Sequence, residues 1–287
     1  MMKQYISTII IAALASVMGA CSAVDDTRPV LAVSIEPQRY MLEQLVGDNY
    51  RIVVLMPGGE NPETFELPVS RHIEVDTARA VFTVGYLPFE QSLAESGSTR
   101  IVNTTAGIEP IYGTHSHTAA SGHTHTHRSA DPHLWTSVRN AHKMCEAMAC
   151  ELSRLIPDSA HIYQQRLKTY QAHLDSLDSA FAQRLQAAEV KSFLVWHPSL
   201  SYFARDYKLN QISVSQHNKD LSPTALRQVI DTAEKSGARV LFNQREYDAR
   251  QVETIGQAVA VRVVDFCPGN YDWETELSNV VDELCKP

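Results

Sequence analysis

Residues 158–189 read DSAHIYQQRLKTYQAHLDSLDSAFAQRLQAAE, a stretch without Gly or Pro. Its apolar residues recur at steps of three and four positions, which is the spacing of one face of an α-helix. They are Tyr163, Leu167, Tyr170, Leu174, Leu177, Phe181 and Leu185. About 28 helical residues would form a rod about 42 Å long. We therefore predict a stiff connector helix that packs along the regions before and after it.

Strand and helix signals alternate on both sides of this connector. Before it, the patterns predict strands at 30–35, 51–56, 80–84 and 101–103, and helices at 38–46, 70–78 and 138–155. After it, they predict strands at 192–196, 211–214, 240–242 and 261–264, and helices at 199–206, 222–236, 249–260 and 273–284. Such alternation is typical of parallel sheets. We predict an α/β fold of two Rossmann-like lobes, 28–157 and 190–287, joined by one long rigid helix at 158–189.

The first 27 residues have the pattern of an export signal followed by a tether. Lys3 precedes the apolar run from Ile6 to Ala15, which is too short to span a bilayer as a mature helix. Met18-Gly19-Ala20-Cys21 resembles a bacterial lipoprotein cleavage box, so 1–20 would be the signal peptide and Cys21 the lipidated residue. Residues 21–27 would form the tether. An ordinary signal peptide with a chance cysteine is the alternative. We expect an exported body, in the periplasm or extracellular space, anchored to a bacterial membrane through lipid.

The net charge and the charge distribution limit which classes of partner we expect for this body. The chain carries a formal net charge of −8 and has no run of Lys or Arg. Nucleic acid is therefore not expected as a partner. An acidic chain is compatible with a cation as its ligand. We also expect the protein to be a monomer.

Four cysteines remain after Cys21, and export permits disulfides. Cys145 and Cys150 are five residues apart on a predicted helix, about 140° around its axis, so they are not expected to pair with each other. Buried free thiols are the simpler interpretation for them. Cys267 and Cys285 flank the last predicted helix and are a possible disulfide that would join it to the sheet.

A histidine-rich tract precedes the connector. Five histidines fall within thirteen residues, spaced by Thr, Ser, Gly and Ala: His115, His117, His123, His125 and His127. The tract has no apolar periodicity, so we expect a solvated loop. Imidazole is a common ligand of transition metals, and the tract would be a weak, multi-site zinc collector. A disordered polar loop without function is the alternative.

Four further residues suit a single defined metal site. Ligands of open parallel sheets bind beyond the carboxyl ends of the strands. Glu63 lies in the Pro/Gly-rich loop after a predicted strand, while His197 and Asp265 each follow one directly. His133 lies between Pro132 and an apolar pair, just after the histidine tract. Each alone is compatible with a helix cap or a surface residue, but two facing lobes would bring all four into one cleft.

At these positions the chain resembles the metal-binding lipoproteins of bacterial ABC importers, the zinc/manganese (TroA-like) substrate-binding family. The loop 57–68 resembles the family's first-ligand loop, and Asp131-Pro132-His133-Leu134-Trp135 matches its second-ligand motif. The segments 196–203 and 264–268 resemble the third and the last. The resemblance runs from about residue 28 to the end of the chain. It implies a metal site formed by Glu63, His133, His197 and Asp265, and a membrane permease as partner.

The first ligand departs from the family pattern. The family usually has His in the sequence Pro-His-Thr-Tyr-Glu, whereas this chain has Pro62-Glu63-Thr64-Phe65-Glu66. Carboxylate binds zinc at nearly the same distance as imidazole, so the site would still be formed. A ligand set that is half carboxylate also suits manganese or iron. The histidine tract, a feature of zinc-specific members, favours zinc.

We therefore predict a high-affinity zinc-binding lipoprotein of a metal ABC importer, not an enzyme, with a manganese- or iron-binding member of the family as the alternative. A zinc hydrolase would need an open coordination position for water and a general base, and the chain has no HExxH motif. A surface adhesin or metal store would use the histidine tract alone.

Overall fold

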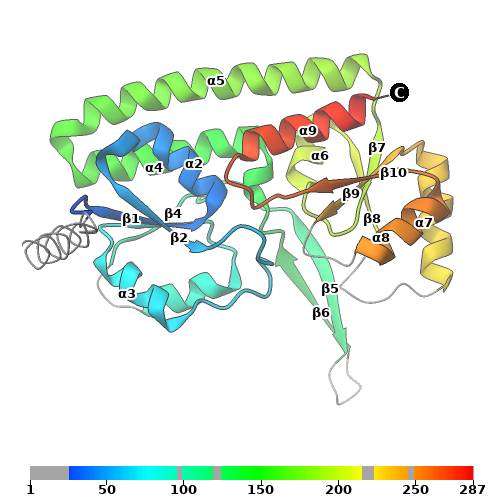
Figure 1. The fold of residues 1–287 in the computed structure, drawn as a ribbon, viewed down its shortest axis with the longest axis horizontal. Helices are drawn as coiled ribbons and strands as arrows, with labels where there is room; N and C mark the ends of the chain where they lie inside the picture. Colours follow the sequence, from blue (N-terminus) through cyan, green and yellow to red (C-terminus); the bar gives the residue numbers. More distant parts are fainter. Residues whose placement is uncertain (1–25, 96–98, 119–123, 215–222, 245–248, 287) are drawn as a thin grey trace, which may run out of the picture.

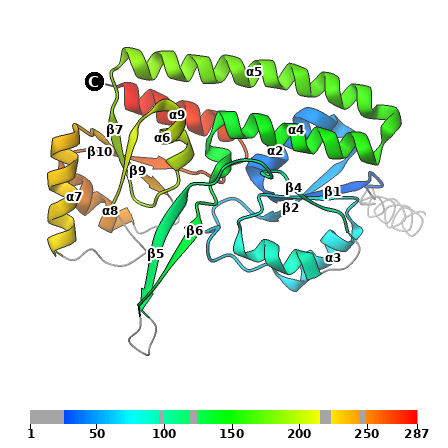
Figure 2. The same cartoon turned by 180° about the vertical axis from the view of Figure 1, so that it is seen from behind.

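The computed structural model describes residues 26–95, 99–118, 124–214, 223–244 and 249–286. The predicted signal peptide, Cys21 and most of the tether lie outside these residues. Two α/β lobes lie side by side, and the helix α5 (Ala160–Ala187) runs along both (Figures 1 and 2). This confirms the predicted fold class. No helix in the described ranges is long and apolar enough to cross a membrane.

The N-terminal lobe is built on a parallel four-stranded sheet with the order β2-β1-β3-β4. Its strands are β1 (Val30–Ile35), β2 (Arg51–Met56), β3 (Val81–Thr83) and β4 (Ile101–Asn103). Its helices are α2 (Glu36–Val46), α3 (Val69–Thr77) and α4 (Val138–Leu155), with short 3-10 turns at Gly47–Asn49, Pro88–Glu95, Leu134–Thr136 and Pro157–Ser159. β1 and β2 are mostly buried, as expected of strands that are covered on both faces.

The C-terminal lobe repeats this plan with the strand order β10-β9-β7-β8, again all parallel. Its strands are β7 (Ser192–Val195), β8 (Asn210–Ser213), β9 (Val240–Gln244) and β10 (Arg262–Phe266). Its helices are α6 (Ser201–Tyr207), α7 (Pro223–Ser236), α8 (Ala249–Val259) and α9 (Trp273–Cys285). In both sheets the carboxyl ends of the strands point toward the junction between the lobes (Figure 1).

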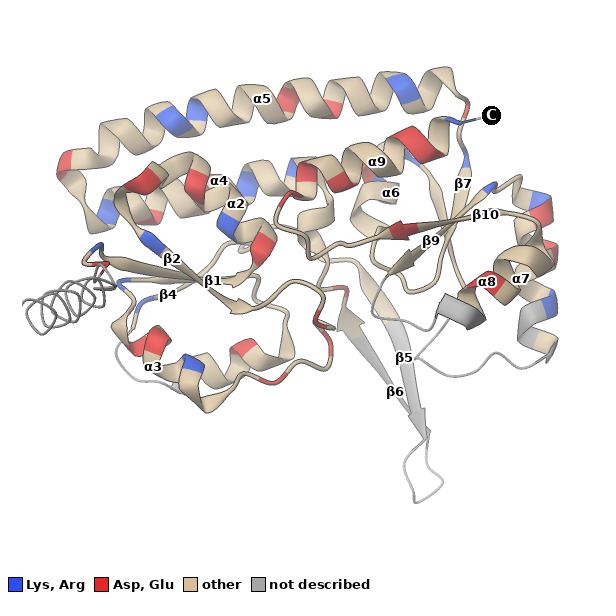
Figure 3. Ribbon diagram, in the orientation of Figure 1, with Lys and Arg blue, Asp and Glu red and all other residues tan. Residues whose placement is uncertain are grey.

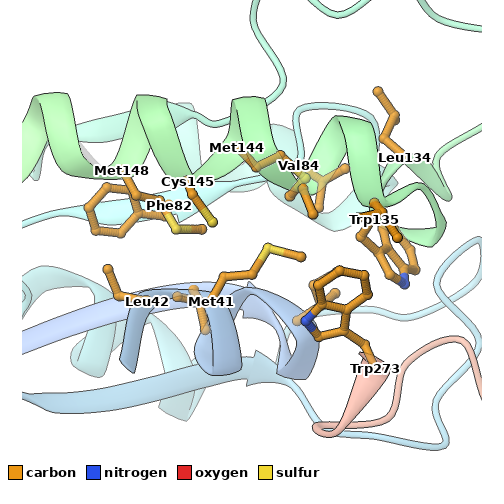
Figure 4. Packing of buried hydrophobic residues seen from close by; sticks show 14 of the residues in the cluster. Met41, Leu42, Phe82, Val84, Leu134, Trp135, Met144, Cys145, Met148 and Trp273 are labelled. Carbon is orange, nitrogen blue, oxygen red and sulfur yellow. The ribbon is translucent and has the colours of Figure 1, made fainter. Parts of the chain in front are cut away.

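Helix α5 packs against α4 and α2 of the first lobe and against α9 of the second, all on the same side of the helix (Figure 1). The predicted apolar stripe is the buried face, with Leu177 only partly buried. Figure 4 shows the core of the first lobe, where Met41 and Leu42 of α2 lie opposite Phe82 and the α4 side chains, while Trp135 lies near Trp273. One hydrophobic cluster therefore includes residues of both lobes and of the connector.

The histidine tract differs from the predicted loop. Most of it lies in an antiparallel ribbon of β5 (Tyr112–Thr118) and β6 (Thr124–Ala130), which extends away from both lobes (Figures 1 and 2). His123 lies outside the described residues. The alternation of Thr with His gives a period of two, and β-branched Thr favours strands. The segment 113–129 has no alternation of large apolar residues, so this period of two was not recognised as a strand pattern.

The possible disulfide between Cys267 and Cys285 is not formed in the structure. Arg262 Nη2 donates a 2.9 Å hydrogen bond to the carbonyl oxygen of Glu283, so the end of α9 lies beside the start of β10. Cys267 lies beyond the opposite end of that strand, about 17 Å away at 3.3 Å per residue. A disulfide needs Cα atoms within about 7 Å. Of the other pair, Cys145 is a buried free thiol and Cys150 is an exposed one.

Candidate metal centre

The four predicted ligands lie on four separate segments near the junction of the lobes. Glu63 lies in the loop between β2 and α3, where its backbone N–H donates to Asn61 Oδ1 at 2.9 Å. His133 precedes the 3-10 turn Leu134–Thr136. His197 follows β7 by two residues. Asp265 was predicted just after a strand, but β10 continues to Phe266, so Asp265 lies inside it. Figure 3 shows acidic residues, in red on the ribbon, along the loop between β2 and α3.

His133 is held in one orientation by Asp131. The Asp131 carboxylate accepts hydrogen bonds of 2.9 Å from both the backbone N–H and the Nδ1 of His133. Burial alone would raise the pKa of Asp131, but the hydrogen bonds and the charge of His133 outweigh it, and the pKa lies below its ordinary value. A proton fixed on Nδ1 leaves the lone pair of Nε2 free to bind a metal ion.

The Nε2 atom of His133 has the environment expected of a metal ligand. The residue is 1% exposed, and Nε2 has no hydrogen-bond partner among the described residues. Buried polar atoms are nearly always paired, because an unpaired one costs about 1–3 kcal/mol. A metal ion bound at Nε2 would supply the missing partner. The donor chemistry of this residue therefore fits a transition metal.

His197 and Glu63 lie next to this atom. The ring of His197 meets the ring of His133 edge-on, with 5.5 Å between the centroids. His197 Nε2 lies 3.3 Å from Glu63 Oε1. Two donor atoms that bind one tetrahedral zinc at about 2.1 Å are themselves about 3.4 Å apart, and two imidazole ligands have centroids about 5 Å apart. Both distances in the protein are close to these values.

Asp265 is not brought to the other three. Its Oδ1 accepts a 3.3 Å hydrogen bond from Asn243 Nδ2 on the neighbouring strand β9, and the two residues are register partners. The structure gives it no hydrogen bond or ion pair with Glu63, His133 or His197. Across the described part of the chain, no three His, Cys, Asp or Glu side chains lie close enough to hold a metal ion as they stand.

Two residues that support the site received no role from the sequence. Asp131 is the first, although its position two residues before His133 was a signal. Tyr202 is the second. Its hydroxyl donates to the carbonyl oxygen of Asp131 at 2.8 Å and accepts from the Ile111 N–H at 3.0 Å. Tyr202 therefore connects the base of the β5–β6 ribbon to the segment that carries His133.

The fold and the site together define a class of protein. The chain has two lobes with parallel sheets, one helix that runs along both lobes, and histidines of both lobes that face each other. These are the features of a substrate-binding protein of metal ABC importers. The chain belongs to the ZnuA family: its profile, described as zinc-uptake complex component A, periplasmic, matches residues 31–274.

Relatives and solved structures agree with this membership. The chain is 24% identical to the high-affinity zinc uptake system protein ZnuA of Bacillus subtilis over 305 aligned positions, which cover 100% of this chain and 91% of that one. A crystal structure of ZnuA superposes with a TM-score of 0.79 at 30% identity, covering 90% of this chain and 98% of the other. FpvC of Pseudomonas aeruginosa, solved in complex with Mn²⁺, shares the fold with a TM-score of 0.74 at 22% identity, covering 90% and 98%.

Proposed function

We propose that this protein captures a zinc ion between its lobes and delivers it to the membrane permease of an ABC importer. The buried, unpartnered Nε2 of His133, facing His197, is the observation that carries the proposal. His133, His197 and Glu63 would bind the ion first, because their donor atoms already lie near one another. The ion is the cargo of the protein and not a resident cofactor.

Asp265 would complete the ligand set after a small local adjustment. Its carboxylate is exposed and is held only by the 3.3 Å hydrogen bond from Asn243, so little is lost when it turns toward the ion. Two imidazoles and two carboxylates would then surround the metal. This set accommodates zinc but is harder than three imidazoles, and manganese or iron is the alternative cargo. The relative named for zinc uptake favours zinc, and the manganese-bound FpvC supports the fold alone.

The β5–β6 ribbon is proposed as an auxiliary zinc collector. Its register pairs His115 with His127 and His117 with His125. Directly opposed residues of an antiparallel pair lie on the same face, as do residues two apart on one strand. The register therefore puts four histidine positions on one face of the ribbon. These pairs lie toward the outer end of the ribbon, while its base is connected by Tyr202 to the segment that carries His133.

We further propose export, a lipid anchor at Cys21 and a monomeric body in the periplasm or extracellular space. We also propose that the protein is not an enzyme. Four protein ligands close the coordination shell of zinc, whereas a zinc hydrolase keeps a position open for water. A metal store or adhesin that uses the ribbon alone would not need the His133–His197 pair.

Metal content measured by mass spectrometry tests this function. The chain from residue 26 onward would be loaded from an equimolar mixture of zinc, manganese and iron, beside His133→Ala and His197→Ala variants. We expect one tightly held zinc per chain and its loss in both variants. The matched control is His173→Ala, a histidine of α5 outside the proposed ligand set. Stoichiometric manganese or iron would change the cargo, and no bound metal in the unmutated chain would contradict the proposed centre.

A further inference from the structure

The segment Cys267–Asp272, here called the interlobe strap, joins β10 to α9 and crosses from the C-terminal lobe to the N-terminal one. Glu276 of α9 fixes its shape. Glu276 Oε2 accepts the N–H of Cys267 at 3.2 Å, and its Oε1 accepts Asn270 Nδ2 at 2.7 Å. The strap is therefore attached firmly to the lobe from which it emerges.

Tyr271 is the residue by which the strap contacts helix α2 of the other lobe. Its hydroxyl donates a short hydrogen bond to the Glu43 carboxylate. The guanidinium carbon of Arg39 lies 5.1 Å from the centroid of the Tyr271 ring, within the range of a cation–π contact. Tyr40 meets the same ring edge-on at 5.2 Å. The side chain of Tyr271 is thus held by three contacts with one helix, α2.

The strap also touches the loop that carries Glu63. A Cβ atom at Gly58, near the start of that loop, would lie 3.4 Å from the carbonyl oxygen of Gly269. The strap begins two residues after Asp265, so it lies between two proposed ligands that belong to different lobes. The strap therefore links the segments that carry a proposed ligand from each lobe.

We propose that Tyr271 is a positioning residue that holds the strap against α2 and thereby limits the rate at which bound metal leaves the centre. This inference rests on the proposed function. Tyr271 is 37% exposed, so its contacts can break without opening the core. When they break, the strap keeps its hydrogen bond from Trp135 to Pro268, but the strand end that carries Asp265 loses its support from α2. The ion then loses a ligand more often, while the other ligands stay in place.

The test uses two variants that remove one side of the contact each, Tyr271→Phe and Glu43→Ala, together with the double variant. Tyr271→Phe keeps the ring and removes only the hydroxyl. Glu74→Ala is the matched control, because Glu74 forms a comparable partly exposed pair with Arg71 at 2.6 Å on α3, away from the strap. Zinc dissociation would be followed by stopped-flow transfer to a chromophoric chelator. Metal stoichiometry and melting temperature would be measured on the same samples.

Each single variant removes one hydrogen bond at a partly exposed site, so we expect dissociation to become roughly three- to tenfold faster in each. The double variant should be no faster than the faster single one, because both changes remove the same contact. Stoichiometry should stay at one, and Glu74→Ala should not change the rate. An unchanged rate in Tyr271→Phe, or an equal rise in Glu74→Ala, would overturn the proposal.

A second measurement separates this proposal from the proposed function. Backbone amide hydrogen exchange of residues 267–272 in the metal-free protein reports on the strap without any bound ion. We expect faster exchange in Tyr271→Phe and Glu43→Ala, with no change in Glu74→Ala. If the unmutated chain binds no metal, the proposed function fails and the exchange result still decides whether Tyr271 holds the strap. Unchanged exchange would refute the role of Tyr271.

Discussion

Trp135 Nε1 donates a 2.7 Å hydrogen bond to the carbonyl oxygen of Pro268. Trp135 follows the proposed ligand His133 by two residues, and Pro268 follows Asp265 by three. The bond therefore joins the segments that carry two ligands from opposite lobes. The indole is 1% exposed, so water cannot replace the bond when it is lost.

Trp135→Phe should destabilise the protein more than Trp273→Phe. Both indoles are buried, at 1% and 2% exposure, but Nε1 of Trp273 has no hydrogen-bond partner among the described residues. The two variants lose similar volume, while only the first leaves a buried carbonyl oxygen unpaired, at a cost of about 1–3 kcal/mol. Urea unfolding of both variants checks this difference. Equal losses would show that the hydrogen bond adds nothing to stability.

Asp131→Asn should weaken zinc binding about 10- to 100-fold, the usual effect of removing the partner of a ligating histidine. The amide can no longer act as a charged acceptor for Nδ1, so His133 is free to take the other tautomer. Competition with a chelator of known affinity measures the change. Asp178→Asn is the control, because Asp178 pairs with Arg139 at 3.1 Å on the outer surface. A similar loss in that variant would point to a general effect of charge.

Glu63→His should shift the metal preference toward zinc. The substitution restores the imidazole that is usual in the family and makes the ligand set softer. Loading from an equal mixture of zinc and manganese, followed by mass spectrometry, gives the ratio of bound metals. We expect at least a severalfold rise in this ratio, whereas Glu60→His, in the same loop, should leave it unchanged. An unaltered ratio in Glu63→His would remove Glu63 from the ligand set.

Glu151→Gln should lower stability at pH 7 but not in acid. The hydrogen bonds from Arg154 hold the pKa of Glu151 below its ordinary 4.5, an effect that burial opposes and Arg100 reinforces. Because the folded-state pKa is lowered, the contribution of this carboxylate is complete above pH 4.5 and is lost as pH falls through the folded-state value. The melting temperatures of the unmutated protein and of Glu151→Gln should converge as the pH falls from 7 to 3. A difference in melting temperature that stays constant over this range would exclude a charge effect.

Deletion of residues 115–127 should leave one tight zinc site per chain and slow the capture of zinc from dilute solution. The four proposed ligands, Glu63, His133, His197 and Asp265, all lie outside the deleted segment. Stoichiometry by mass spectrometry and association rates by stopped flow measure the two effects separately. Replacement of the four paired histidines by Ser, in an otherwise intact ribbon, is the matched variant. Loss of the tight site in that variant would favour a metal store based on the ribbon.

The sequence was sufficient to predict the two lobes and the connector, because apolar spacing reports directly on burial. Tyr163 and Leu185 could be assigned to the buried face of α5 for this reason. The β5–β6 ribbon was not predicted, since its sequence lacks the alternation of apolar residues by which a strand is recognised. The metal centre was predicted only as a set of residues. The 3.3 Å approach of Glu63 to His197 depends on the packing of the two lobes, and the pairing of Asp265 with Asn243 depends on the register of two strands in one lobe.

Helix α5 has a consequence for how the importer tells loaded from empty protein. Tyr163 of the helix lies 3.5 Å, hydroxyl to hydroxyl, from Tyr50 of the first lobe, and Phe181 packs edge-on against Tyr207 of the second. Swinging the lobes apart would expose such buried side chains at about 2 kcal/mol each. We therefore expect the overall outline of the molecule to stay the same with and without cargo. A permease would then have to recognise the loaded state from the local surface at the rim of the proposed metal centre, where the ion changes the charge.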